Sequence, residues 1–327
     1  MPDLTAWNNM TGIKAYRLAD TKGLPKDEWL SIRQKGIGGS DIAAIAGLNP
    51  FKSAIEVFLD KTGRAEPIKE NSKMKWGKLL EDPVAQEYSA STGKKVQRVN
   101  AVLQDTKTPH FLANIDRIAS GNGQGNGILE VKCTSWAKAW DGGIIPDFYY
   151  TQLQWYLGVC GLAWGQFATL ISGSDLLIPP VTPADPKCIH NLFVIADRFW
   201  TQNVLKDTPP PPDQNPATRE AYKILYPDIT DETITLPEAL NPLIHTRKRL
   251  DTAIKEATSQ KAAIDSQVLA HLKNSRYGIT KDFKITRIKR TAPRFDAKAF
   301  KEVHPKIHST FLVSSSTVYP AYNPRKT

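Results

Sequence analysis

The chain has 327 residues, of which 41% are hydrophobic and 23% charged, with a formal net charge of +10. Such a chain can bury a substantial core, and it contains neither an 18-residue apolar run nor a basic-then-apolar N-terminal signal, so we expect a soluble protein that is not secreted. Cys133, Cys160 and Cys188 form no CxxC unit, which argues against structural zinc or an iron–sulfur cluster.

The first predicted helices lie near residues 25–35 and 40–47, on either side of a glycine-rich turn. The turn ends in Gly38-Gly39-Ser40-Asp41, which predicts a helix N-terminus with free N–H groups and a capping hydroxyl, a ready site for phosphate. Arg33 is spaced to add a bidentate grip on the same anion. An ordinary helix cap beside a surface arginine explains these residues as well, so both interpretations stay open.

Two further helices are predicted near residues 53–62 and 72–92. The second has one broad apolar face, formed by Trp76, Leu79, Leu80, Val84 and Tyr88. Glu81 borders this face, so its carboxylate should be partly buried and should need a cation, for which a metal ion is one candidate. A half-exposed Glu81 paired with Lys78 is the alternative.

The central sheet is predicted from strands near residues 96–104, 110–118, 127–133 and 165–172. Asp116 lies at the end of the second strand and Glu130-Val131-Lys132 in the third, joined by the glycine-rich hairpin loop 120–127. The glycines of this loop precede a strand and not a helix, so it is not a nucleotide-binding fingerprint. Because side chains alternate along a strand, Glu130 and Lys132 should share one face.

This pattern predicts metal-dependent hydrolysis of a phosphate ester. Carboxylate oxygens of Asp116 and Glu130 suit Mg²⁺ or Mn²⁺, and Lys132 can hold or help deprotonate a metal-bound water. A solvent-exposed Glu-x-Lys on a hairpin is the commoner explanation of the pattern when it stands alone.

The next predicted helices lie near residues 146–162 and 186–205. In the first, Gln152 shares a face with Tyr149 and Tyr156, from which amide and phenol groups can reach phosphates or a metal-bound water. An amphipathic core helix with aromatic packing is the alternative.

A run of four prolines divides the chain. We predict a core over residues 1–208, a stiff spacer over 209–216 and a C-terminal extension over 217–327. The extension is predicted to hold one long helix, whose apolar residues have near-heptad spacing, and then a basic strand and tail. Because Arg247 and Lys261 interrupt this stripe, a short packed helix is favoured over an extended coiled coil. A strand is predicted over 277–288.

Positive charge is concentrated at the C-terminal end. Residues 276–327 hold twelve Lys and Arg against three Asp and Glu, a balance of +9, which leaves the preceding 275 residues near neutral. We predict that this basic segment contacts duplex DNA or helps to close an oligomer around it. A solvated basic surface is the alternative. The histidines, including His304 and His308 with Pro305 between them, form no metal cluster.

Six ordered blocks within roughly residues 25–172 resemble the phage-type exonuclease family, the YqaJ-like viral recombinases related to lambda exonuclease. The blocks are Trp29–Arg33 with Gly36–Ile45, Gly47–Ser53, Lys61–Gly63, Trp76–Glu81 with Tyr88–Gly93, Asp116 with Glu130–Lys132, and Tyr149–Tyr156. The resemblance implies an α/β (α+β) fold. Its restriction-endonuclease-like PD-(D/E)XK core would have a central mixed β-sheet flanked by helices, with a C-terminal helical and basic extension.

The resemblance also implies an activity. Members of this family degrade the 5′-ended strand of linear double-stranded DNA with Mg²⁺, leaving a 3′ overhang for a single-strand annealing protein in homologous recombination. It implies two ions per site, a ring-shaped homotrimer, action on double-stranded DNA ends and a place in the cytoplasm of a bacterial host. The open alternatives are a structure- or sequence-specific endonuclease of the same fold, a non-catalytic DNA-end-binding or annealing protein, and a structural role.

Roles follow from the resemblance position by position. Asp116, Glu130, the Val131 carbonyl and Glu81 match the metal site. Lys132 and Gln152 match catalytic positions, and Arg33 and Ser40, with Gly39 beside them, match the grip on the 5′-phosphate. Tyr149 and Tyr156 are predicted DNA contacts from their place beside Gln152.

Overall fold

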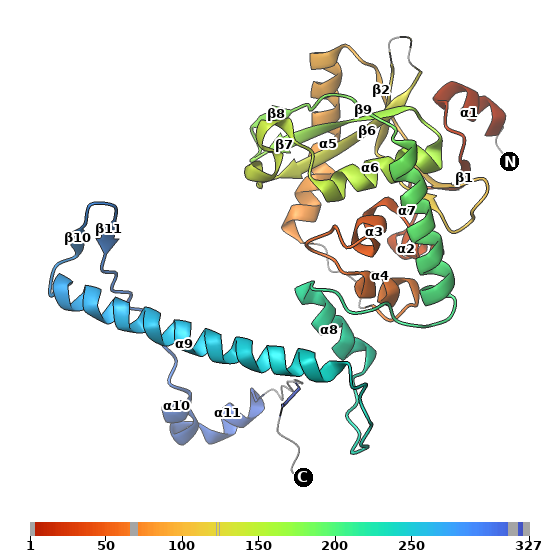
Figure 1. Ribbon diagram of the computed structural model, residues 1–327. Coiled ribbons are helices and arrows are strands. Elements are labelled where there is room, and N and C mark those ends of the chain that lie inside the picture. The colour runs from red at the N-terminus through yellow and green to blue at the C-terminus, as the bar shows by residue number, and fades with distance from the viewer. Residues whose placement is uncertain (1–3, 66–70, 122, 124, 313–319, 323–327) are drawn as a thin grey trace. The chain divides into compact units, whose positions relative to one another are not determined.

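The computed structural model describes residues 4–65, 71–121, 123, 125–312 and 320–322 (Figure 1). The chain forms two compact units, residues 1–229 and 230–327. Helix α8 (Pro216–Leu225) and the prolines before it belong to the first unit, where Asn215 Nδ2 donates to the Asn49 carbonyl at 3.2 Å and Tyr222 donates to the Pro210 carbonyl. The division therefore falls 13 residues after the end of the predicted spacer, between residues 229 and 230.

Within the described residues, the first unit is built on a mixed sheet of six strands. Five of them follow the order β2-β5-β6-β7-β8, and the sixth, β9, also pairs with β7. Strands β6 and β7 are parallel and helix α6 connects them; the other pairs are antiparallel. The strands are β2 (Val96–Arg98), β5 (Arg117–Ala119), β6 (Gly127–Thr134), β7 (Trp164–Ile171), β8 (Asp175–Leu177) and β9 (Thr182–Pro183). The predicted mixed α/β fold is confirmed.

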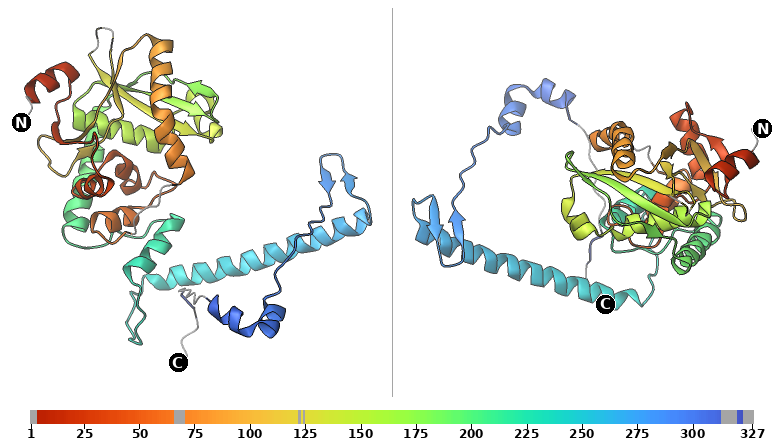
Figure 2. Two further views of the ribbon diagram at one scale, coloured as in Figure 1. Left: turned by 180° about the vertical axis from the view of Figure 1, so that it is seen from behind. Right: turned by 90° about the horizontal axis from the view of Figure 1, so that it is seen from above.

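Helices cover both faces of this sheet (Figure 2, right). Helix α5 (Ser72–Thr92) packs Val84 and Tyr88 against Leu129 and Val131 of β6. Helix α6 (Asp147–Cys160) packs on the opposite face, where Ile128 is buried. Alternation along β6 places Glu130 and Lys132 on one face, as the sequence predicts, and the structure turns that face toward α6.

Two predicted strands, 96–104 and 110–118, are each divided between sheets. The chain leaves the main sheet after β2 and enters a three-stranded antiparallel sheet of order β1-β3-β4. It returns just before β5, where the Val99 N–H donates to the Asp116 carbonyl at 3.1 Å. Asp116 thus lies at the junction between sheets. These strands are β1 (Tyr16–Asp20), β3 (Ala101–Gln104) and β4 (Leu112–Ala113).

The remaining helices of the first unit are α1 (Leu4–Thr11), α2 (Lys26–Gln34), α3 (Gly39–Ile45), α4 (Ala54–Lys61), the 3₁₀ segment η1 (Ala137–Gly143), α7 (Pro186–Phe199) and the π-helical turn η2 (Trp200–Val204). Helices α3 and α7 pack against α6, and α4 packs against α3.

Helix α5 differs from its predicted apolar face. Val84 and Tyr88 are buried, but Trp76 and Leu79 are exposed, because only the second half of the helix lies over the sheet. The first half thus presents apolar side chains at the surface of the unit.

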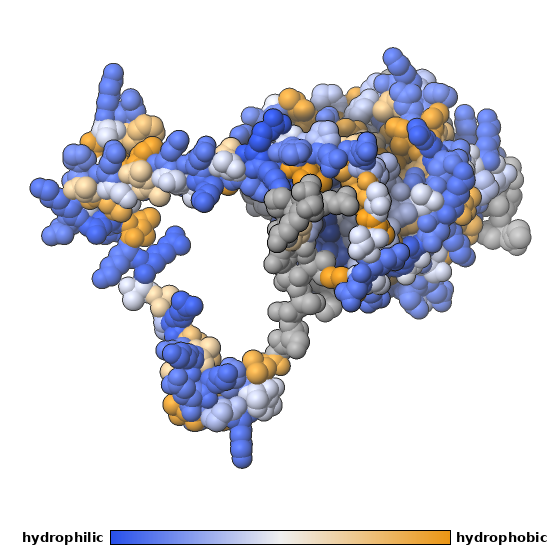
Figure 3. Space-filling model, turned by 60° about the horizontal axis from the view of Figure 1, so that its bottom comes forward, coloured by the Kyte–Doolittle hydropathy of each residue, from blue (hydrophilic) through white to orange (hydrophobic). Residues whose placement is uncertain are grey.

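The C-terminal unit is dominated by helix α9 (Leu240–Leu272), which runs for 33 residues without interruption. The predicted long helix is present, but the expectation that it is short and packed is wrong: Leu243, Leu250, Ile254 and Ile264 are all exposed. Hydrophobic side chains at the surface of this unit are visible in Figure 3. The predicted strand 277–288 is a hairpin of β10 (Tyr277–Ile279) and β11 (Lys284–Thr286), followed by α10 (Ala297–Val303) and α11 (Pro305–Thr310). None of the described helices has the length and apolar character needed to cross a membrane.

Candidate active site

The predicted acidic pair and lysine converge where β5 and β6 meet. The Val131 N–H donates to Asp116 Oδ2 at 3.0 Å, which ties the carboxylate at the start of β5 to the backbone of β6. On the α6 side, Lys132 Nζ lies 2.7 Å from Glu130 Oε1. Glu130 is only 2% exposed. Short-range strand pairing therefore brings the three side chains to one place.

Helix α6 completes the cluster with an amide and a phenol. Gln152 Nε2 donates to Glu130 Oε1 and to the Tyr156 hydroxyl, each at 3.0 Å, and Lys132 Nζ lies 3.4 Å from Gln152 Oε1. The ring of Tyr149 covers the same ammonium, 4.9 Å from Nζ to the centroid. Tyr156 is buried, so the structure does not favour its predicted DNA contact.

Glu81 approaches from α5 but faces arginines. Its Oε1 accepts from Arg117 at 3.0 Å and from Arg98 at 3.1 Å, and Arg117 also pairs with Asp82. The sequence alone leaves a metal ion and Lys78 equally open as partners of Glu81. In this arrangement the two arginines hold the carboxylate, and the metal-binding role of Glu81 stays a prediction.

The cluster carries more negative charge than its cations balance. Burial and then the neighbouring Asp116 charge raise the pKa of Glu130 to about 8, against the opposing pull of Lys132. Burial and Asp116 likewise raise the pKa of Glu81. For Lys132, burial alone would lower the pKa, but Glu130 and Asp116 prevail and raise it. Lys132 is therefore held as a cation.

The donor set fits a hard divalent cation. Glu130 Oε2 is buried and has no hydrogen-bond partner among the described residues, although a buried carboxylate oxygen is costly to leave unpaired. A second carboxylate, Asp116, is close enough to raise the pKa of Glu130. Within the described residues no three His, Cys, Asp or Glu side chains are already grouped as metal ligands. The two carboxylates would thus need backbone or water oxygens to complete coordination.

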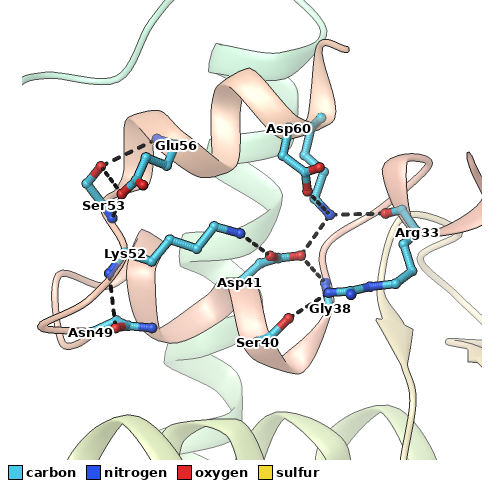
Figure 4. A network of polar contacts seen from close by, with 10 residues as sticks. Arg33, Gly38, Ser40, Asp41, Asn49, Lys52, Ser53, Glu56 and Asp60 are labelled. Carbon is cyan, nitrogen blue, oxygen red and sulfur yellow. Dashed lines mark hydrogen bonds and ion pairs between the residues drawn. The ribbon is translucent and has the colours of Figure 1, made fainter. Parts of the chain in front are cut away.

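The residues of the predicted phosphate grip lie side by side at the start of α3 (Figure 4). Arg33 Nη2 donates to Ser40 Oγ at 2.7 Å, and the guanidinium lies over the Trp29 ring at 4.6 Å. The predicted capping hydroxyl is absent, because the N-cap residue is Gly38, which has no side chain. The Gly38 N–H donates to the side chain of Asp41 at Oδ2. Ser40 is therefore exposed and turned toward Arg33, where both groups can meet an anion.

A buried charge network supports this loop (Figure 4). Asp41 lies 2.7 Å from Lys61 Nζ and 3.0 Å from Lys52 Nζ, and both Asp41 and Lys61 side chains are fully buried. Lys61 also donates to the Arg33 carbonyl at 3.0 Å. Although burial opposes it, the two lysines hold the pKa of Asp41 far below its usual range.

Tyr156 connects the two clusters. Its hydroxyl accepts from Gln152, and its ring packs against Gly39, where an added Cβ would lie 2.3 Å from the ring. Gly39 is therefore required for close approach of α3 and α6, which sets the spacing between the anion grip and the acidic pair.

Sequence reasoning missed the supporting charges. Arg117 is buried beside Glu81, and Asp41 with Lys61 forms the ion pair under the α3 turn. One signal was available, because Arg117 directly follows Asp116 within an apolar strand where a charge must find a partner. Lys52 and Lys61 gave no such signal.

Comparison with known proteins places these residues in a family context. The family model described as YqaJ-like viral recombinase domain matches residues 28–163. The protein YqaJ of Bacillus subtilis (strain 168) is 34% identical over 305 residues, covering 91% of this chain and 94% of its own length. The solved alkaline exonuclease LHK-Exo of Laribacter hongkongensis is 19% identical, with a TM-score of 0.47, over 61% of this chain and all of its own.

Proposed function

The chain belongs to the YqaJ-like viral recombinase family, and on this premise we propose that it is a metal-dependent exonuclease acting on the ends of linear double-stranded DNA. The observation that carries the proposal is the Asp116–Glu130–Lys132 cluster, with its buried, unpartnered Glu130 oxygen. A purely structural ion pair usually satisfies both oxygens of a buried carboxylate.

Mg²⁺, with Mn²⁺ as a substitute, is the proposed cofactor, held by Asp116, Glu130 and the Val131 carbonyl as two ions. When bound, it supplies Lewis-acid stabilisation of the phosphate and acidifies water. Lys132 stays protonated beside Glu130 and orients the attacking water or the phosphate oxygen by its N–H donors. Gln152 donates to Glu130 and accepts from Lys132, which keeps the two side chains in position.

The polarity of digestion is proposed to be 5′ to 3′. The support is the Arg33–Ser40 pair, because a guanidinium and a hydroxyl at a helix start suit a terminal phosphate monoester. Such a grip beside the cluster would position the strand for successive cuts and leave a 3′ single strand for an annealing partner. We further propose that the protein acts as a homotrimer in the bacterial cytoplasm. The basic segment 276–327 is proposed to contact the duplex DNA.

The experiment compares linear duplex DNA, 5′-phosphorylated or not, with covalently closed circular DNA, in Mg²⁺ or EDTA. We expect the wild-type protein to digest linear 5′-phosphorylated duplex in Mg²⁺ only. Lys132→Ala should slow digestion at least ~100-fold, as loss of one transition-state donor does.

Exposed Lys95→Ala is the matched control and should digest normally. Equal digestion by Lys132→Ala and wild type would overturn the mechanism. Cutting of closed circles would favour an endonuclease of the same fold.

A further inference from the structure

An aromatic cavity adjoins the active site and takes no part in the chemistry above. It has a volume of about 1030 Å³ and is lined by side chains that include Phe51, Trp76, Trp136, Phe148 and Tyr149. Phe51 is 66% exposed, Trp76 58% and Trp136 47%. Large aromatic rings left in contact with water around one cavity indicate a binding surface.

Ring contacts lead from this cavity to the catalytic lysine. Phe51 packs edge-on against Trp136 and Phe148, at 5.8 and 5.9 Å between centroids. Phe148 contacts Tyr149 at 4.2 Å, and Tyr149 covers Lys132 Nζ. The exposed ring of Phe51 is thus three contacts away from Lys132, the group proposed to meet the scissile phosphate.

A second connection leads from the cavity to the phosphate grip. Asn49 Oδ1 accepts from the backbone N–H groups of Phe51 and Lys52, which fixes the Phe51 loop. Lys52 in turn pairs with Asp41 under the Arg33–Ser40 site. The loop that carries Phe51 is therefore connected to the terminal-phosphate grip through Lys52 and Asp41. Phe148 is connected to the catalytic Lys132 through Tyr149.

We propose that this cavity, formed by Phe51, Trp76, Trp136 and Phe148, stacks the unpaired base of the terminal nucleotide whose strand is being cut. The inference rests on the proposed function, since one nucleotide spans the two phosphates that the exonuclease would hold. Among the described residues that line the cavity, Lys73 is charged and none is acidic, which suits a nucleotide. Stacking tolerates any base, because every base has a π-face.

The test uses duplexes that carry a 5′-phosphate on either a terminal thymidine or a terminal abasic nucleotide. Affinity is measured in EDTA. Wild type should bind the thymidine end about 5- to 100-fold more tightly, the range expected for stacking of one base. The Phe51→Ala/Trp136→Ala double variant should lose this discrimination but bind the abasic end like wild type, which also serves as its folding control.

Rescue and control variants isolate the rings. Phe51→Tyr/Trp136→Phe should restore discrimination, and Tyr226→Ala, which removes an exposed ring elsewhere in the unit, should leave it unchanged. If the double alanine variant still discriminates between the thymidine and abasic ends, the inference is overturned. It is also overturned if the variant changes its oligomeric state and keeps this discrimination, because the cavity would then be a subunit contact. If wild type discriminates but digests no linear duplex in Mg²⁺, the proposed function fails while base stacking stands.

Discussion

Two buried carboxylates in one unit have opposite electrostatics. Asp41 and Glu130 are both nearly inaccessible to water. Asp41 faces two lysines and a backbone N–H, and its pKa is lowered; Glu130 faces Asp116 and one lysine, and its pKa is raised. The difference shows that burial alone does not mark a reactive site. A satisfied carboxylate supports the fold, whereas an underbalanced one with a free oxygen is suited to bind a cation.

The largest expected effect comes from breaking the satisfied cluster. Asp41→Asn removes the buried carboxylate that pairs with Lys61 and leaves that lysine only the partly exposed Asp60, so the free energy of unfolding should fall by about 3–5 kcal/mol. Urea unfolding measures this change. Glu220→Gln, which removes an exposed pair with Lys223, is the control and should change stability by less than ~1 kcal/mol. A loss of similar size in both variants would mean that the buried pair of Asp41 and Lys61 contributes no more to stability than an exposed ion pair.

The same cluster predicts a pH dependence. The folded-state pKa of Asp41 lies below its ordinary value of 3.8, so its stabilising contribution is present above about pH 4 and is lost as the pH falls. The stability gap between wild type and Asp41→Asn should therefore be constant from pH 5 to 7 and shrink below pH 4. Urea unfolding across this range tests it, and a gap that widens in acid would contradict the sign.

Glu130→Gln tests the opposite case. Without metal, the variant should unfold with the same or a higher free energy than wild type, because burial and then Asp116 raise the pKa of Glu130 and make its ionised form costly in the folded state. Digestion of linear duplex should fall by about 10²–10³-fold. Thermal unfolding should also show that Mg²⁺ stabilises wild type, by about 2.7 kcal/mol at 100 times the dissociation constant, and not the variant.

The control for this variant is Glu87→Gln, which changes an exposed carboxylate on α5. It should keep both the activity and the response to Mg²⁺. If Glu130→Gln strongly lowers the free energy of unfolding in EDTA, Glu130 supports the fold in the way that Asp41 does, and the contrast between the two carboxylates fails.

The sequence predicted the parts of the site that depend on local periodicity. Alternation along β6 placed Glu130 and Lys132 on one face, and helical spacing placed Gln152 beside Tyr156. It did not predict that Arg117 would hold Glu81, because that contact depends on how α5 lies across β5. For the same reason the exposure of Trp76 was missed: a helix pattern does not reveal where the sheet beneath it ends.

The smallest expected effect concerns Ser40, which touches neither buried carboxylate. Ser40→Ala removes the hydroxyl that accepts from Arg33, but Arg33 keeps its contact with Trp29. Preference for a 5′-phosphorylated over a 5′-hydroxyl end should fall about 5-fold, the equivalent of one hydrogen bond of ~1 kcal/mol. Digestion of paired substrates measures the ratio, and Ser31→Ala, an exposed serine on α2, is the control. Because Ser40 is exposed, its loss should leave unfolding unchanged; a fall in stability instead would mean that the α3 turn relies on this hydroxyl as well as on Asp41.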